Sequence, residues 1–252
     1  MIIDAHTHVT RDGKWFGTTY NASVDNLLRQ LDRSKVERSV LLPLAGTTDN
    51  QFIAQCVRQH PDRFIGFGTI RLNTWSRDID EIIQLNLKGV KLHPRIQKET
   101  LRDWFDNGIL NKLSDLSLPI TVCGWPQSTA VEIPIDTIIP TEVDRIAKRL
   151  PSLKVIIAHL AGHRFWDAFF CARSNQNVYL DCSYFFSFMK GTSIERDFWK
   201  TIKKIDQKII FGSDFPEVDI FEYFNYFKRK IEKSDIDQSK VFCSNLSELL
   251  KK

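Results

Sequence analysis

Several common sequence signals are absent from this chain of 252 residues. No apolar run is long enough to span a bilayer, and Asp4 and His6 interrupt the N-terminus where a signal peptide would need an apolar stretch. The five cysteines are odd in number, and none forms a CxxC pair. This pattern argues against a disulfide framework and a zinc ribbon. It favours free thiols in a reducing compartment, which predicts a cytoplasmic protein.

The charge balance is not extreme. Lys and Arg number 35 against 31 Asp and Glu, so the net charge is +4, well short of the basic surface of a nucleic-acid-binding protein. Hydrophobic residues make up 42% of the chain, which is typical of a globular protein with a large core. We therefore expect a small-molecule substrate and no nucleic-acid or membrane partner; a homo-oligomer is compatible with the sequence.

Short β-rich runs alternate with amphipathic segments along the chain, the pattern of βα units and a parallel sheet. Strands are expected at Met1–His6, Arg38–Pro43, Phe64–Ile70, Gly89–His93, Pro119–Cys123, Lys154–His159, Val178–Cys182 and Ile209–Gly212. Helices are expected at Ser23–Ser34, Asp49–His60, Ser76–Leu87, Glu142–Leu150, Phe165–Arg173 and Glu195–Ile205.

Eight strands alternating with helices predict an α/β fold, a single (β/α)8 TIM-barrel domain over residues 1–252. A doubly wound open sheet is the alternative, but no Gly-rich phosphate loop follows any of the strands.

Polar side chains gather where the expected strands end, which is the active-site face of such a barrel. His6 and His8 lie two residues apart at the end of the first strand, so they project to the same side. Other strand ends carry Lys91, His93, His159 and Asp214. Imidazoles and a carboxylate are the ligands that a catalytic zinc or similar divalent ion requires.

The chain resembles the amidohydrolase superfamily, and within it the amidohydrolase-related (amidohydrolase 2) group of metal-dependent hydrolases and decarboxylases. The stretches that carry the resemblance are Ile3–His8, Gly89–Pro94, Val155–Gly162, Asn177–Asp181, Ile210–Pro216 and Asn245–Leu250. The resemblance implies that His6, His8 and Asp214 hold Zn²⁺ or another divalent metal. It further implies that Asp214 takes a proton from water and that His159 orients or protonates the substrate.

One departure from the family pattern concerns the end of the fifth strand. Members of the group usually carry a ligand histidine there, and this chain has Cys123. A thiolate is a competent zinc ligand, so Cys123 is a candidate fourth ligand. The alternative is that Cys123 is a small buried hydrophobic residue in a metal-poor or metal-free site, as in some lactonases of the group.

The residues around these strand ends suggest what the pocket binds. Arginine suits carboxylate recognition through its planar fork, and Arg95 follows the fourth strand. In the group resembled here, a lysine at the position of Lys91 is common without being carboxylated, and we expect it to bind an anion. The expected substrate-binding residues are Lys91, His93, Arg95 and Trp125.

The leading hypothesis is a metal-dependent hydrolase or decarboxylase that acts on a small, carboxylate-bearing compound. A TatD-type deoxyribonuclease is an alternative, because such enzymes share the positions of His6, His8 and Asp214, but they usually carry a glutamate where this chain has Lys91 and His93. A third possibility is a metal-free lactonase or a binding barrel without catalysis, which only Cys123 supports.

Overall fold

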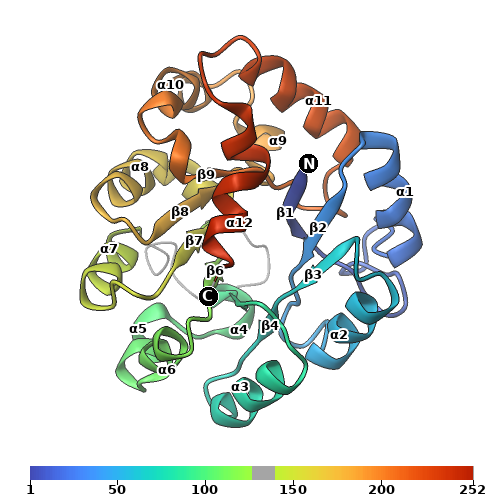
Figure 1. Cartoon of the computed structure of the whole chain (residues 1–252), viewed down its shortest axis with the longest axis vertical. Coiled ribbons are helices and arrows are strands. Elements are labelled where there is room, and N and C mark those ends of the chain that lie inside the picture. Colours follow the sequence, from blue (N-terminus) through green and yellow to red (C-terminus); the bar gives the residue numbers. More distant parts are fainter. Residues whose placement is uncertain (127–139, 252) are drawn as a thin grey trace.

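The computed structural model describes residues 1–126 and 140–251, and its parallel strands follow one another around a barrel (Figure 1). The strands form two hydrogen-bonded groups, β1 to β3 and β4 to β9, and within each group every strand pairs with the strand that follows it in the sequence. The strands are β1 (Ile3–Thr7), β2 (Arg38–Leu41), β3 (Phe64–Gly66), β4 (Gly68–Thr69), β5 (Val90–Leu92), β6 (Ile120–Val122), β7 (Val155–Ile157), β8 (Val178–Asp181) and β9 (Ile209–Ile210).

Backbone hydrogen bonds join the two groups of strands at both seams. Between β3 and β4 the chain is interrupted only at Phe67, so these two strands together occupy the third expected position. At the other seam the Ala5 N–H donates to the Phe211 carbonyl at 2.9 Å, and the Asp214 N–H donates to the His6 carbonyl at 2.9 Å. The first and last strands therefore lie side by side, and the expected TIM-barrel fold is confirmed.

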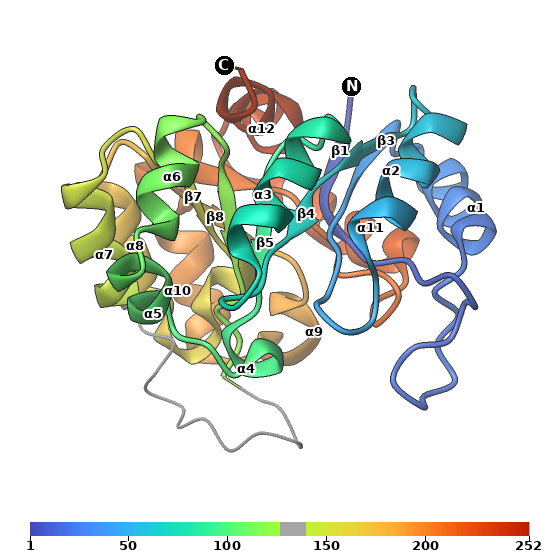
Figure 2. The same cartoon turned by 90° about the horizontal axis from the view of Figure 1, so that it is seen from below.

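The inside of the barrel is filled by apolar side chains that alternate along the strands. Ile3 and Ala5 of β1 pack there with residues of β2, β3, β7 and β9, and with Leu246 and Leu249 of α12 (Asn245–Leu249). Helix α12 crosses the end of the barrel at which the chain begins (Figures 1 and 2). Because that end is covered, the pocket must open at the other end, where the strands finish.

The outer helices pack their apolar sides against the strands. In α1 (Val24–Ser34) the Ser23 side chain accepts from the Asn26 N–H, and Leu27 and Leu31 at helical spacing are fully buried. The remaining larger helices are α2 (Asn50–Gln59), α3 (Trp75–Gln84), α7 (Pro140–Arg149), α8 (Phe165–Ser174), α10 (Ser193–Thr201) and α11 (Ile220–Ile231). Each expected helix is present, with ends that differ by a few residues.

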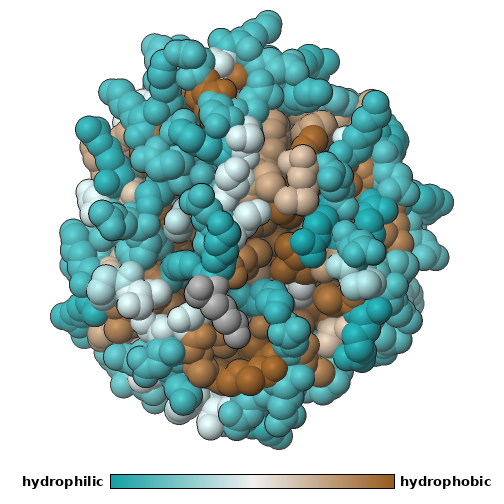
Figure 3. Space-filling model, viewed as in Figure 1, coloured by the Kyte–Doolittle hydropathy of each residue, from teal (hydrophilic) through white to brown (hydrophobic). Residues whose placement is uncertain are grey.

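Shorter helices occupy connections for which the sequence made no such prediction. These are α4 (Pro94–Gln97), α5 (Leu101–Asp106), α6 (Ile109–Asp115) and α9 (Phe185–Met189). Figure 2 places α4 and α9 at the end of the barrel opposite α12. On the face that carries α12, hydrophilic side chains cover most of the rim, with hydrophobic surface near the centre (Figure 3). None of the helices in the described ranges is long and apolar enough to cross a membrane.

Gly89 provides a test of how tightly the strands pack. A Cβ atom at this position would lie 2.6 Å from the Phe67 ring and 2.8 Å from the Pro119 carbonyl oxygen. Gly89→Ala should therefore lower the free energy of unfolding by about 1–3 kcal/mol, the usual cost of overpacking. Urea denaturation measures the change.

Lys88→Ala is the matched control, because the neighbouring side chain is exposed and its replacement should change stability by less than about 0.5 kcal/mol. Equal stability of the two variants would show that Phe67 and Pro119 can move apart around residue 89 at little cost in free energy.

Candidate active site

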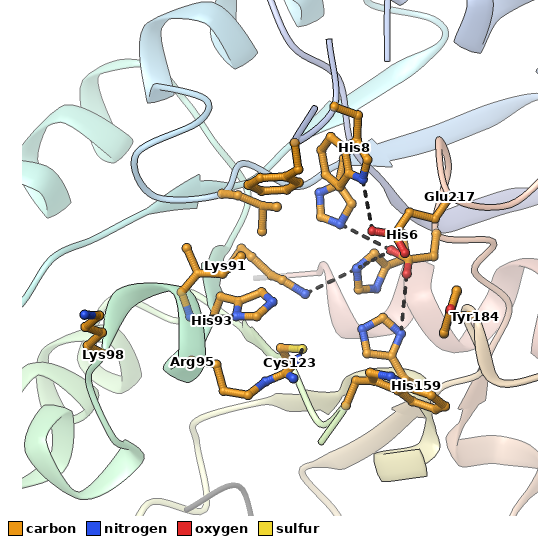
Figure 4. A pocket seen from close by; sticks show the side chains of 16 residues that line it. His6, His8, Lys91, His93, Arg95, Lys98, Cys123, His159, Tyr184 and Glu217 are labelled. Atoms are coloured by element: carbon orange, nitrogen blue, oxygen red, sulfur yellow. Dashed lines mark hydrogen bonds and ion pairs between the residues drawn. The ribbon is translucent and has the colours of Figure 1, made fainter. Parts of the chain in front are cut away.

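A pocket of about 660 Å³ opens at the carboxyl ends of the strands. The sequence-predicted residues His6, His8, Lys91, His93, Arg95, Cys123, Trp125, His159 and Asp214 all line it. Figure 4 shows His6, His8, Lys91, His93, Cys123 and His159 around a common space, with Lys98 at its outer edge. The structure thus brings together residues as far apart in the sequence as His6 and Asp214.

Three of these side chains meet at the base of the pocket. Asp214 Oδ1 lies 3.4 Å from His6 Nε2 and 3.3 Å from His8 Nε2. The ligand atoms of His6, His8 and Asp214 lie within 4.8 Å of one another, and in the described ranges this is the only such group that could hold a metal ion. Cys123 is not part of this group, so its role as a fourth ligand stays a prediction.

Both imidazoles are oriented by a hydrogen bond on their far side. His6 Nδ1 lies 2.5 Å from Asp181 Oδ2, and His8 Nδ1 lies 2.6 Å from the Leu42 carbonyl oxygen. A carbonyl oxygen only accepts, so His8 Nδ1 carries the proton, and the Asp181 carboxylate selects the same tautomer in His6. Each ring therefore presents the lone pair of Nε2 to Asp214, which is the form that binds a metal.

Asp214 is an anion held in an unusual backbone conformation. Burial alone would raise the pKa of its carboxyl group, but the nearby charge of His159 is the chief cause that lowers it, to about 2. Its φ of 81° lies in the left-handed region, which is rare for an L-residue other than glycine, asparagine or aspartate. The hydrogen bond from the Asp214 N–H to the His6 carbonyl holds this conformation against β1.

His159 is placed by a turn of left-handed residues directly after β7. His159, Leu160 and Ala161 have φ values of 59°, 49° and 56°. The Nδ1 atom lies 3.0 Å from the Ser183 carbonyl oxygen and 4.0 Å from Asp214 Oδ2. Burial would lower the pKa of His159, but Asp214 and the Cys123 sulfur raise it to about 9, so the ring is a cation at neutral pH.

Lys91 is a buried amine beside the three-residue group. Its Nζ atom lies 3.2 Å from His6 Nε2, and the side chain is 1% exposed. Burial lowers the pKa of Lys91, and it also lowers that of His6, where the Lys91 charge adds to the effect. Lys91 was expected to bind an anion and His6 to bind a metal, and the sequence did not predict that the two side chains would be in contact.

Aromatic residues form the wall on the side of the first strand. The Trp15 ring stacks on His8 with ring centroids 5.2 Å apart, and Trp15 Nε1 donates to Glu217 Oε1 at 2.9 Å. On the opposite side, the Trp125 ring lies edge-on to His159 and to Tyr184.

Sequence reasoning missed four contributors to the site: Asp181, Ser183, Tyr184 and Glu217. Asp181 does lie in a family-like stretch, Asn177–Asp181, and it could have been found as the inward-facing polar residue at the end of β8.

The donor set fits a divalent ion. Two neutral imidazole nitrogens and one carboxylate oxygen suit zinc, manganese or iron, and each histidine has the outer hydrogen bond that accompanies metal ligation. Lys91 and His159 both lie against these residues, and the cationic form of each would oppose a second positive charge.

A parallel barrel with polar side chains gathered in a pocket at its strand ends has the architecture of the TIM-barrel enzymes. The amidohydrolase family model matches residues 3–250, so the chain belongs to that family. No curated protein sequence matches the chain.

Solved structures with the same fold have low sequence identity. A TIM-barrel protein from Bordetella bronchiseptica is 18% identical, with a TM-score of 0.81, over 99% of this chain and 98% of that one. A probable 2-pyrone-4,6-dicarboxylic acid hydrolase from Acinetobacter baumannii with citric acid bound is 20% identical, with a TM-score of 0.70 and coverage of 99% and 98%. The 5-carboxyvanillate decarboxylase from Novosphingobium aromaticivorans, complexed with manganese and 4-hydroxy-3-methoxy-5-nitrobenzoic acid, is 14% identical, with a TM-score of 0.73 and coverage of 100% and 96%.

Asp181→Asn tests whether Asp181 sets the His6 tautomer. An amide can donate as well as accept, so the variant should allow His6 to carry its proton on either nitrogen. Nitrogen NMR of histidine-labelled protein should show one His6 tautomer in the wild type and a mixture in Asp181→Asn.

Asp32→Asn is the control, because that side chain is 66% exposed and pairs with Arg63, away from the pocket. Unchanged His6 nitrogen shifts in Asp181→Asn would show that another group orients the ring.

Proposed function

We propose that this protein is a metal-dependent hydrolase or decarboxylase that acts on a small, carboxylate-bearing compound. The observation that carries the proposal is the approach of Asp214 Oδ1 to His6 Nε2 and His8 Nε2, at 3.4 and 3.3 Å, in a pocket that also contains cationic side chains. Membership of the amidohydrolase family supports it. So does the occurrence of both reaction types, on carboxylate compounds, among proteins with the same fold.

His6, His8 and Asp214 would hold the metal ion. When bound, a divalent ion supplies Lewis-acid chemistry, by activating water or by polarising a substrate oxygen. The donor set does not select between zinc and manganese, and a decarboxylase of the same fold carries manganese.

Asp214 and His159 are the proposed catalytic residues. The low pKa of Asp214 keeps it ionised, so it can accept a proton from water at the base of the pocket. His159 is a cation whose Nδ1 is engaged by Ser183, which leaves Nε2 to orient the substrate or donate a proton. One group thus accepts a proton while its neighbour gives one.

The substrate carboxylate would bind on the side of the pocket formed by β5 and α4. Arg95 is 5% exposed, and within the described ranges neither its Nε nor its Nη1 has a hydrogen-bond partner. A buried guanidinium with open donors favours a carboxylate, which it can bind with two hydrogen bonds. Lys91 adds to the positive side of the pocket, His93 adds a polar ring, and Trp125 provides an apolar surface for the rest of the molecule.

A metal-free hydrolase is the second candidate, and the position of Lys91 favours it. Lys91 Nζ lies 3.2 Å from His6 Nε2, so a lysine cation already stands beside a metal-ligating lone pair. In that reaction Asp214 would still accept the proton from water, while Lys91 would balance the negative charge that develops on the substrate.

Asp214→Asn tests the proposal directly. An amide cannot accept a proton from water, so turnover of an active small carboxylate should fall by at least about 100-fold. The variant should stay folded, because asparagine tolerates the left-handed backbone of this position, but its melting temperature should fall, because the His159 cation loses its buried partner.

Calorimetric titration of the wild type with Mn²⁺ and Zn²⁺ gives the metal arm of the test. The wild type should bind one ion per chain and Asp214→Asn should bind it much more weakly. Near-normal turnover in the variant would refute the mechanism, and full turnover of the wild type in chelator would favour the metal-free candidate.

A further inference from the structure

The two histidines of the three-residue group are held in different ways. His6 Nδ1 lies 2.5 Å from Asp181 Oδ2 and 3.1 Å from the Ser183 hydroxyl, so two side chains orient that ring. His8 Nδ1 lies 2.6 Å from the Leu42 carbonyl oxygen, which belongs to the backbone. Hydrogen bonds hold an imidazole by its edge, because its nitrogens donate and accept in the plane of the ring. The faces of the His8 ring must be held by packing.

Trp15 is stacked on the His8 ring. The two ring centroids lie 5.2 Å apart, and the ring planes differ by 25°. Trp15 is 3% exposed, although it comes from the loop after β1 and not from the barrel wall. It forms a small hydrophobic cluster with Ala22 and Leu44, and Ile96 packs against this cluster. The indole therefore has a fixed place beside a candidate metal ligand.

The turn that carries Trp15 is strained and held by several hydrogen bonds. Phe16 has a φ of 44°, in the left-handed region that a bulky side chain rarely adopts. The Thr18 N–H and hydroxyl both donate to the Trp15 carbonyl oxygen, at 2.8 and 2.6 Å. The Thr10 hydroxyl donates to the Lys14 carbonyl oxygen at 2.9 Å. A strained backbone persists only where its surroundings fix it, so these contacts keep the Trp15 side chain in place.

Glu217 accepts the hydrogen bond of the indole. Trp15 Nε1 donates to Glu217 Oε1 at 2.9 Å, and the N–H of a buried indole requires such an acceptor. Glu217 comes from the turn after β9, and its own N–H donates to the Asp214 carbonyl oxygen at 3.0 Å. Figure 4 shows Glu217 on the same side of the pocket as His8.

These contacts form a closed circuit around two of the candidate ligands. His8 stacks on Trp15, Trp15 donates to Glu217, and Glu217 donates to the Asp214 backbone. Asp214 Oδ1 lies 3.3 Å from His8 Nε2, which completes the circuit. The loop after β1 and the turn after β9 are thus joined at the two ligand side chains and again through the indole.

We propose that Glu217 and Trp15 are positioning residues for His8. The hydrogen bond to Glu217 keeps the indole stacked on the imidazole, and the stack keeps the ring plane turned so that Nε2 faces Asp214. Neither residue is a ligand: the indole N–H only donates, and Glu217 lies outside the three-residue group. The inference deepens the proposed function, on whose metal site it rests, by naming groups that set how tightly the ion is held.

A matched pair of variants at Glu217 tests the proposal. Glu217→Leu removes the acceptor, whereas Glu217→Gln keeps an oxygen that can accept the indole hydrogen bond. The residue is exposed, so both variants should fold. In calorimetric titration, Glu217→Leu should bind Mn²⁺ at least about tenfold more weakly than the wild type, the usual effect of releasing a ligating histidine, and Glu217→Gln should stay within about threefold.

Glu222→Leu is the control for the loss of one carboxylate, because that side chain is 74% exposed and lies outside the pocket. It should bind Mn²⁺ as the wild type does. Unchanged binding by Glu217→Leu would overturn the proposal. So would an equal loss in Glu217→Gln, because the charge of Glu217 rather than its hydrogen bond would then act on the ion.

NMR of the metal-free protein separates this inference from the proposed function. The stacked indole shields the His8 ring protons, whose signals are identified by their absence in His8→Gln. These signals should lie at the same place in the wild type and Glu217→Gln, and should move downfield in Glu217→Leu. A wild type that binds no Mn²⁺ would refute the metal mechanism. The downfield shift in Glu217→Leu would then still support the positioning role, and unchanged His8 signals would overturn it.

Discussion

The buried chain of polar groups from Asp181 through His6 to Asp214 is the constraint on which the site depends. His6 is fully buried, so both of its ring nitrogens must find partners within the protein. Asp181 takes the proton side of the ring, and the lone-pair side faces Asp214 and Lys91. A carboxylate in such a place is tolerated only where positive or hydrogen-bonding groups compensate for lost hydration. His159 supplies much of that compensation for Asp214, and it thereby acquires its own charge.

The backbone at Gly212 passes unusually close to His6 and Asp181, the first two residues of this chain of polar groups. A Cβ atom at Gly212 would lie 2.9 Å from the His6 Cβ and 3.1 Å from Asp181 Oδ1, so glycine is required where the last strand passes the centre of the barrel. Left-handed conformations at His159, Leu160, Ala161 and Asp214 each cost about 1–3 kcal/mol unless the surroundings fix them. Leu160 is fully buried, and the Asp214 N–H is hydrogen-bonded to β1. Packing around Leu160 and this hydrogen bond therefore keep the backbone in the strained conformations that direct the His159 and Asp214 side chains into the pocket.

The sequence was most informative about features that a regular spacing of residues determines, such as the strand positions and the side of a strand on which a residue lies. Alternating βα segments placed the strands to within a few residues, and two-residue spacing correctly put His6 and His8 on one side of β1. The interruption at Phe67 was not predicted; Gly66 and Gly68, which flank it, lie against side chains of the outer helices, and this close approach does not show in the sequence pattern. The contacts of Lys91 with His6 and of Cys123 with Arg95 could not be predicted, because they depend on the tilt of strands and the course of a short helix rather than on spacing along the chain.

The pocket divides into two chemically different halves, and His159 belongs to both. On one side, His6, His8 and Asp214 form a candidate site for a cation. On the other, the Arg95 guanidinium lies against the Cys123 sulfur, and Lys91 and His93 line the same pocket. A molecule with a carboxylate and a separate reacting carbon would span both halves, with its charge on the arginine side and its reacting atoms near His159. Because one hydroxyl and one carbonyl oxygen of Ser183 hold His159 in place, the two halves meet at a single fixed imidazole, which is where the proposed proton donor must lie to reach that carbon.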